Sequence, residues 1–209
     1  MIVCGQFVRA RGICRAKSSL AISRSKTSQE SMQSTPNTVP SSISSSILEF
    51  CRSIAPTEPV FITSVPLRRS ATSFCFENVD RKIAKSGGSK LFGWAIWHIP
   101  DLYFEAEHHA VWRNKNGGLI DVSPQMGQRR RMLFLPDPSA VYDPMCPHPN
   151  ILAPDGASPK ALEFVQLGQQ RNALLMQCRI LGTAEIRLFA ADQIELALID
   201  RRIQELLTV

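Results

Sequence analysis

The sequence predicts an α+β fold, in which a helix that carries Cys75 packs on a small antiparallel sheet and is followed by C-terminal helices. Phe76, Val79 and Ile83 recur at the spacing of one helical face. From residue 91 the chain changes to aromatic and β-branched runs that are separated by turns, which is typical of strands. Helical periodicity returns after a proline-rich stretch. These three observations therefore indicate a helix, then a sheet, then more helices.

The N-terminal segment, residues 1–45, is expected to be disordered, and residues 46–209 to form a single α+β domain. The segment is rich in Ser, Arg and Lys, and its first acidic residue is Glu30. A segment of this composition has too few apolar side chains to offset the entropy that the chain loses when it becomes ordered. An Arg- and Ser-rich, acid-poor start also resembles an organelle transit peptide. A cytoplasmic protein with a disordered tail is the preferred interpretation, and the transit peptide is the alternative.

Local signals predict the order of elements within the domain. Ser73 is a good helix N-cap, and the pair Gly87-Gly88 ends the helix that follows it. The run Asn114–Gly118 is typical of a hairpin turn, because Asn and Gly tolerate a positive φ. The expected elements are a helix over 45–54, extended pieces over 55–66, the Cys75 helix, strands over 91–97, 102–112, 119–123 and 132–135, a proline-rich loop over 136–159 and helices within 160–207, with the core at 71–136.

The positive charge of the chain does not fall on the predicted domain. The formal net charge is +6, and residues 1–70 hold nine Lys and Arg against three Asp and Glu, whereas residues 71–209 hold fifteen of each. Binding of phosphates requires a basic face, and the run Arg129–Arg131 is interpreted as a solvated loop. A nucleic-acid partner is therefore not expected. A membrane is not expected either, since no apolar run reaches the ~18 residues of a membrane span.

The six cysteines include no Cys-x-x-Cys pair, which disfavours a disulfide framework or a four-ligand zinc site. Such spacing suits a reducing compartment, where thiols stay free. Cys146-Pro147-His148 offers two metal ligands, which are too few to define a site. No cofactor and no metal are expected.

Cys75 is the candidate nucleophile. It is expected at about the second position of its helix, where unpaired backbone N–H groups and the positive end of the helix dipole favour a thiolate. The thiolate is the nucleophilic form of cysteine. The alternative interpretation is a small core residue beside Phe74 and Phe76.

The hairpin supplies candidate partners for this thiol. With the turn centred on Lys115, paired residue numbers add up to 230, and His109 lies directly opposite Asp121. Opposed residues share a face of the sheet, so the carboxylate could orient the imidazole, which could accept the thiol proton. A shift of the pairing by one residue would place the two side chains on opposite faces.

Four further residues have two interpretations each. His108 competes with His109 but is interpreted as a packed histidine. Asn78 lies one helical turn after Cys75, where it could support the site or face solvent. Trp94 and Trp112 could wall a substrate groove or belong to the core.

A cysteine that opens a helix, then a histidine on a strand, then an aspartate on the next strand resembles the order in transglutaminase-like and other papain-like cysteine enzymes. The matching blocks, within residues 71–124, are Cys75-Phe-Glu-Asn-Val, His109-Ala-Val-Trp and Gly118-Leu-Ile-Asp121-Val-Ser-Pro. They are also similar to small uncharacterised bacterial and phage proteins with C-x-x-N, G-W, H-x-V and L-x-D-[VI]-[ST]-P blocks. The resemblance implies a papain-like core, with Cys75 as nucleophile, His109 as general base and then acid, and Asp121 as the orienting carboxylate.

The resemblance also implies an acyl-enzyme intermediate that water or an amine resolves. Papain-like enzymes often have a Gln shortly before the cysteine, and residues 66–73 contain none, which leaves the Cys75 backbone N–H as the oxyanion donor. The first hypothesis is a cysteine hydrolase or acyltransferase that acts on an amide, ester or protein substrate. The second is a non-catalytic binding module of the same fold, and the third is nucleic-acid binding by the basic N-terminal segment. The substrate and the oligomeric state are not indicated.

Overall fold

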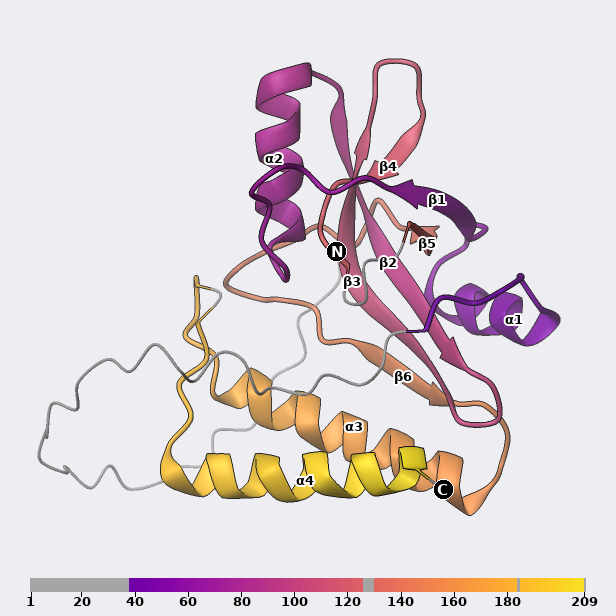
Figure 1. Cartoon of the computed structure of the whole chain (residues 1–209), viewed down its shortest axis with the longest axis vertical. Coiled ribbons are helices and arrows are strands. Elements are labelled where there is room, and N and C mark those ends of the chain that lie inside the picture. Colours follow the sequence, from indigo (N-terminus) through magenta and orange to yellow (C-terminus); the bar gives the residue numbers. More distant parts are fainter. Residues whose placement is uncertain (1–37, 126–129, 184, 209) are drawn as a thin grey trace, which may run out of the picture. The chain divides into compact units, whose positions relative to one another are not determined.

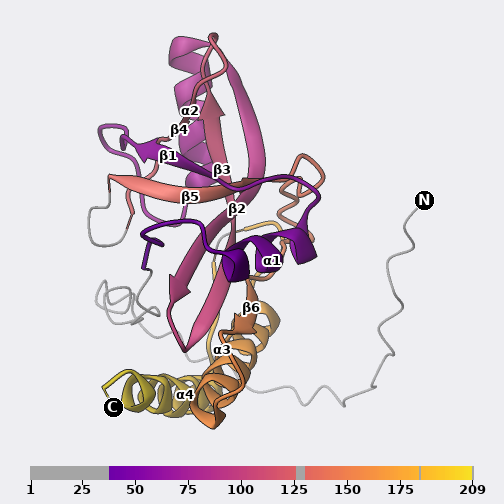
Figure 2. The same ribbon diagram turned by 90° about the vertical axis from the view of Figure 1, so that its right-hand side faces the viewer.

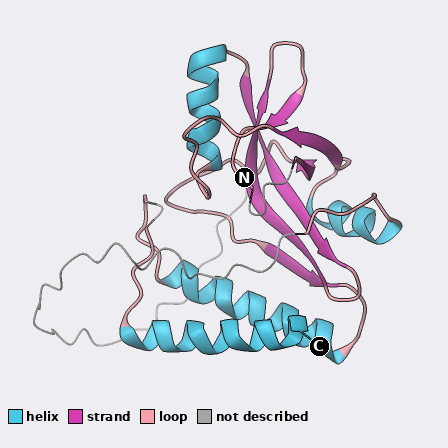
Figure 3. Cartoon of the chain, viewed as in Figure 1, coloured by secondary structure: helices cyan, strands magenta, loops and turns pink. Residues whose placement is uncertain are grey.

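The computed structural model describes residues 38–125, 130–183 and 185–208. They form an α+β fold with four helices and one six-stranded sheet, and they belong to one compact unit, 34–209 (Figure 3). The elements in chain order are α1 (Ser45–Ile54), β1 (Val60–Ser64), α2 (Cys75–Ser86), β2 (Ser89–Ile99), β3 (Tyr103–Arg113), β4 (Leu119–Asp121), β5 (Arg131–Pro136), β6 (Ile151–Pro154), α3 (Pro159–Gln177) and α4 (Ala190–Thr208).

Five of the strands close into a barrel. The strand order is β2-β5-β1-β4-β3-β6, and β2 also pairs with β3 along its whole length. The strands β2, β5, β1, β4 and β3 therefore form a ring, and β6 extends the sheet from β3. The prediction of a purely antiparallel sheet is wrong at one junction, because β1 runs parallel to β4. β1 also lies before the predicted core range 71–136.

Strand β3 has a gap in its pairing on one side. There, β6 pairs with residues 103–106 and β4 pairs with residues 112–113. The two strands meet β3 at opposite ends (Figure 1). The described chain contributes no ladder partner to residues 107–111 on that side. His108 and His109 lie in this gap.

Helix α2 begins one residue later than predicted. Its N-cap is Phe74, which makes no side-chain capping bond, and Cys75 is its first helical residue. Ser73 is not the cap, since its φ is 65°, in the left-handed region. The helix ends at Gly87 as predicted, with a φ of 67°. It packs through Val79, which is fully buried against Ala110 of β3.

The hydrophobic core has separate parts inside and outside the barrel. Helix α1, predicted over the observed residues, is capped by Ser44 and packs its Ile47 and Cys51 against the barrel. Helices α1 and α2 lie against different parts of the barrel (Figures 1 and 2). The barrel interior contains Ile62, Leu91, Ala95, Trp97, Val111, Met132 and Phe134.

The C-terminal helices confirm the prediction for residues 160–207 and cover β6. Phe164 of α3 and Ile203 of α4 are buried together with Leu152 of β6. The predicted 136–159 loop contains β6, which the sequence pattern did not reveal, because four residues are too few for a clear alternation.

The predicted disordered segment lies mostly outside the described residues, as do Cys4 and Cys14. Its last part is ordered, contrary to the prediction. The carbonyl of Thr38 accepts a hydrogen bond from the His98 backbone N–H at 3.0 Å, and Pro40 is buried. Arg131, predicted in a solvated loop, begins β5 and lies over the ring of Phe61. No helix in the described ranges is both long and apolar enough to cross a membrane.

Candidate active site

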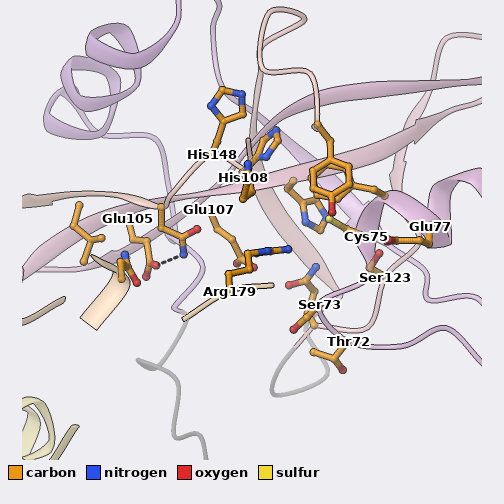
Figure 4. Close-up of a pocket in the computed structure, with 18 of the residues that line it drawn as sticks. Thr72, Ser73, Cys75, Glu77, Glu105, Glu107, His108, Ser123, His148 and Arg179 are labelled. Atoms are coloured by element: carbon orange, nitrogen blue, oxygen red, sulfur yellow. Dashed lines mark hydrogen bonds between the residues drawn. The ribbon is translucent and has the colours of Figure 1, made fainter. Parts of the chain in front are cut away.

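A cleft of about 290 Å³ opens at the gap in β3. Its lining includes Cys75 from the start of α2, His109 from β3 and Ser123 just after β4. Figure 4 shows these elements around the cleft. The three predicted functional elements therefore meet at one place, although they come from separate parts of the chain.

Cys75 lies at the N-terminus of α2 with 8% of its surface exposed. The first hydrogen bond of the helix runs from the Asn78 N–H to the Phe74 carbonyl at 2.9 Å. The N–H of Cys75 belongs to the first turn, whose N–H groups have no partner within a helix. The N-terminus of α2 therefore presents this N–H donor and the positive end of the helix dipole to the cleft.

His109 and Asp121 form a buried hydrogen-bonded pair. Nε2 of His109 donates to Oδ1 of Asp121 at 3.1 Å, and the two side chains are 6% and 0% exposed. This arrangement leaves Nδ1 of the imidazole for the thiol, as the assigned roles require.

The predicted register of this hairpin is wrong by two residues. Trp112 pairs with Ile120 and Arg113 with Leu119, so paired numbers add up to 232, and Asp121 lies opposite Val111. The turn is centred on Asn116, because the Asn114 side chain accepts bonds from the Asn116 and Gly118 backbone N–H groups. A register shift of two residues keeps His109 and Asp121 on the same face of the sheet, where they pair diagonally across the two strands.

The carboxylate of Asp121 accepts four hydrogen bonds. Besides His109, the donors are the Ser64 hydroxyl at 2.6 Å, the Ser123 backbone N–H at 3.0 Å and the Gln125 side-chain amide at 2.8 Å. Burial alone would raise the pKa of Asp121. The hydrogen bond and charge of His109, and then the hydrogen bond from Ser64, outweigh it and lower that pKa below its ordinary value.

At His109, burial and the neighbouring groups likewise have opposite effects on the pKa. Burial favours the neutral imidazole, but the charge of Cys75 and then the bond to Asp121 favour the imidazolium. The result is a pKa of His109 well above its ordinary value of 6.5. A protonated imidazole is the partner that a thiolate–imidazolium pair requires.

Asn78 supports the site and does not face solvent. It is 1% exposed, and its Nδ2 donates to the Ala71 carbonyl at 2.8 Å and to the Ser123 hydroxyl at 3.2 Å. It thereby ties the segment before Cys75 to the segment after Asp121. This bridge connects the segments that carry Cys75 and Asp121.

Neither tryptophan lines the cleft, so their interpretation as walls of a substrate groove is wrong. Trp94 is 5% exposed in the core beside α1, and its Nε1 donates to Asp137 at 3.0 Å. Trp112 packs beside α2 and donates to the Gly87 carbonyl at 2.8 Å.

His108 is a packed histidine, as predicted. Its Nε2 is 2.7 Å from the Ala140 carbonyl oxygen. Burial lowers the pKa of His108, and the bond to Ala140 only partly opposes this. A neutral imidazole that holds a loop carbonyl does not compete with His109.

Several cleft residues carried no recognisable signal in the sequence. Ser64 reaches the site because β1 lies beside β4, and Gln125 because the chain turns back after β4. Tyr142 and His148 come from the loop before β6, and Arg179 follows α3. By contrast, Ser123 lies within the recognised block Gly118–Pro124, and Gln125 follows it directly.

The other described cysteines differ from Cys75. Cys51 is fully buried in the core, and burial raises its pKa to about 12. Cys146 is exposed on the proline-rich loop, outside the cleft lining. Among the described residues no three His, Cys, Asp or Glu side chains are grouped to hold a metal ion.

Fold and site together define an α+β barrel protein with a Cys–His–Asp constellation in a cleft beside β3. No protein-family model, curated protein or solved structure matches the chain.

Proposed function

We propose that the protein is a cysteine hydrolase or acyltransferase that attacks an amide or ester carbonyl, built on a papain-like core of the transglutaminase-like kind. The observation that carries the proposal is the buried imidazole of His109, bonded through Nε2 to Asp121 and protonated under the influence of Cys75. Nucleophilic catalysis by cysteine needs such an arrangement of thiol, base and orienting group.

In the first step, the thiolate of Cys75 attacks the substrate carbonyl carbon. The π electrons move onto the oxygen, where the backbone N–H of Cys75 at the helix N-terminus is the available donor. Collapse of the tetrahedral intermediate breaks the bond to the leaving amine or alcohol. That group takes the proton from His109 and departs, leaving a thioester and a neutral imidazole.

In the second step, water or an amine attacks the thioester. His109 accepts the proton of this nucleophile, while Asp121 stabilises the imidazolium that forms. The C–S bond breaks, and Cys75 returns as the thiolate. The products are an acid when water attacks and a new amide when an amine attacks.

The proposal is tested by the selectivity of thiol modification. In the full-length protein, iodoacetamide at neutral pH is expected to alkylate Cys75 at least about tenfold faster than the exposed Cys146, because the thiolate is the reactive form. Cys51 is expected to stay unmodified while the protein is folded. Peptide mass spectrometry of timed samples gives the three rates.

A matched set of variants completes the test. His109→Gln is expected to abolish the preference for Cys75, and Cys146→Ser is expected to leave it unchanged. p-Nitrophenyl acetate is expected to acetylate Cys75 and then release acetate. Equal alkylation of Cys75 and Cys146, with no acetyl-enzyme, would favour the non-catalytic binding module instead.

A further inference from the structure

The cleft continues from Cys75 along Glu107 to helix α3 and the segment after it. Gly168, Arg171 and Asn172 lie on one face of α3, at the spacing of adjacent helical turns, and all three line the cleft. At Gly168 a Cβ atom would lie 2.6 Å from a methyl carbon of Leu152. Helix α3 thus lies close to β6 at this position, and its two polar side chains reach the cleft.

Arg171 has an unused donor in this wall. Its Nε donates to Oδ1 of Asp200 at 2.7 Å, and its side chain is 12% exposed. Its Nη2 is buried and has no hydrogen-bond partner. A buried charged nitrogen without an acceptor is costly, so an acceptor from a bound molecule would lower the free energy of the occupied cleft.

Arg179 places a second guanidinium in the same wall. Its Nε donates to the Thr183 carbonyl at 3.2 Å, and within the described ranges Arg179 forms no ion pair with a carboxylate. In Figure 4 its side chain extends among the labelled lining residues, near Glu107 in this view. Its terminal nitrogens are therefore open to a ligand.

Two acidic residues of the cleft make hydrogen bonds to other elements of the fold. Glu105 accepts a hydrogen bond from the Asn150 side chain at 2.7 Å, and Glu107 accepts one from the Trp97 indole at 2.9 Å. Both bonds fix elements of the fold to β3. On the α3 side, Arg171 and Arg179 contribute guanidinium donors to the cleft, and guanidinium groups prefer carboxylates as partners.

We propose, on the basis of the proposed function, that Arg171 and Arg179 bind a carboxylate of the acyl donor. The substrate class is then an amide or ester that carries a carboxylate a few bonds from the carbonyl attacked by Cys75. A carboxylate at this end of the cleft would orient the carbonyl at the other end.

Three probes of similar size test the charge preference. They are glutaramate, which has one carboxylate and one amide, its uncharged analogue glutaramide, and 5-aminopentanamide, which carries an ammonium. Binding to the full-length Cys75→Ala protein is measured by calorimetry, so that the result does not depend on thiol chemistry. Glutaramate is expected to bind about tenfold more tightly than glutaramide, since a hydrogen bond to a charged group contributes that much.

Variants assign the preference to the proposed residues. Arg179→Gln is expected to reduce the difference between glutaramate and glutaramide, since Arg171 remains, whereas Arg201→Gln, on the exposed surface of α4, is expected to leave it unchanged. In the Cys75-containing protein, glutaramate is expected to slow alkylation of Cys75. Equal binding of all three probes, tighter binding of the ammonium, or glutaramate binding without protection of Cys75 would overturn the inference.

A failure of the proposed function would give a different experimental result. In that case Cys75 reacts no faster than Cys146 and forms no acetyl-enzyme, whatever the probes show.

Discussion

At the scale of single residues, burial and charge act against each other in the candidate site. The low dielectric of the interior disfavours both the imidazolium of His109 and the carboxylate of Asp121. Each charge is retained because the other is adjacent, and the neighbouring Cys75 further favours the imidazolium of His109. Removal of one member therefore changes the ionisation of the others.

The titration of His109 tests this dependence. Cys75→Ala removes the largest influence that raises the pKa of His109, so that pKa is expected to fall. The imidazole NMR signals, followed from pH 5 to 10, report it. Cys146→Ala should leave the titration unchanged. An identical curve for the Cys75→Ala protein would mean that thiol and imidazole are not coupled.

At the scale of elements, the site depends on how closely β2 and β5 approach. Gly93 of β2 pairs with His109 on one side and with Pro136 on the other. A Cβ at Gly93 would collide with the Leu135 carbonyl oxygen and lie 3.0 Å from the Asp137 nitrogen, both of them backbone atoms. Backbone atoms of paired strands cannot move aside without disturbing the ladder that positions His109.

Gly93→Ala is therefore expected to lower the free energy of unfolding by about 2 kcal/mol or more. Gly168→Ala is the matched control, because its added Cβ meets only the end of the Leu152 side chain, and Ala is about 1 kcal/mol better than Gly within a helix. The two proteins are compared by urea unfolding. Equal stabilities would show that the β2–β5 contact is more adaptable than the geometry implies.

At the scale of the whole molecule, Asp121 connects three strands of the barrel. It lies at the end of β4 and binds Ser64 of β1 and His109 of β3. Because its pKa is lowered in the folded state, the unfolded chain binds more protons near and below pH 4. The stability that Asp121 contributes is therefore complete above pH ~4 and is lost as the pH falls through the folded-state pKa.

Asp121→Asn is expected to lower the free energy of unfolding at pH 7 by about 3 kcal/mol, because the positive charge of His109 loses its buried partner. The difference from the unmodified protein should shrink as the pH falls from 5 to 2. Asp80→Asn serves as control, since Asp80 is an exposed carboxylate paired with Lys90 on the surface. Denaturant unfolding across this pH range gives the curves, and a constant difference would contradict the assigned ionisation.

Local patterns were enough to predict most of the helices and strands. The apolar face of α1, the glycines after α2 and the Asn-Gly turn each act within a few residues of the chain. His109 and Asp121 still form their hydrogen bond, even though the predicted register was wrong by two, because an even shift preserves the face of a strand. A shift by one would have separated His109 from Asp121.

Tertiary contacts decided the remaining features. The parallel pairing of β1 with β4 brought Ser64 to Asp121, and the pairing of β6 with β3 brought α3 and its Arg171 to the cleft. Residues that lie far apart in the chain meet only through the closure of the barrel and the packing of its surrounding helices. Sequence periodicity indicates on which face of its own helix or strand a residue lies. Which other element packs against that face depends on the whole fold.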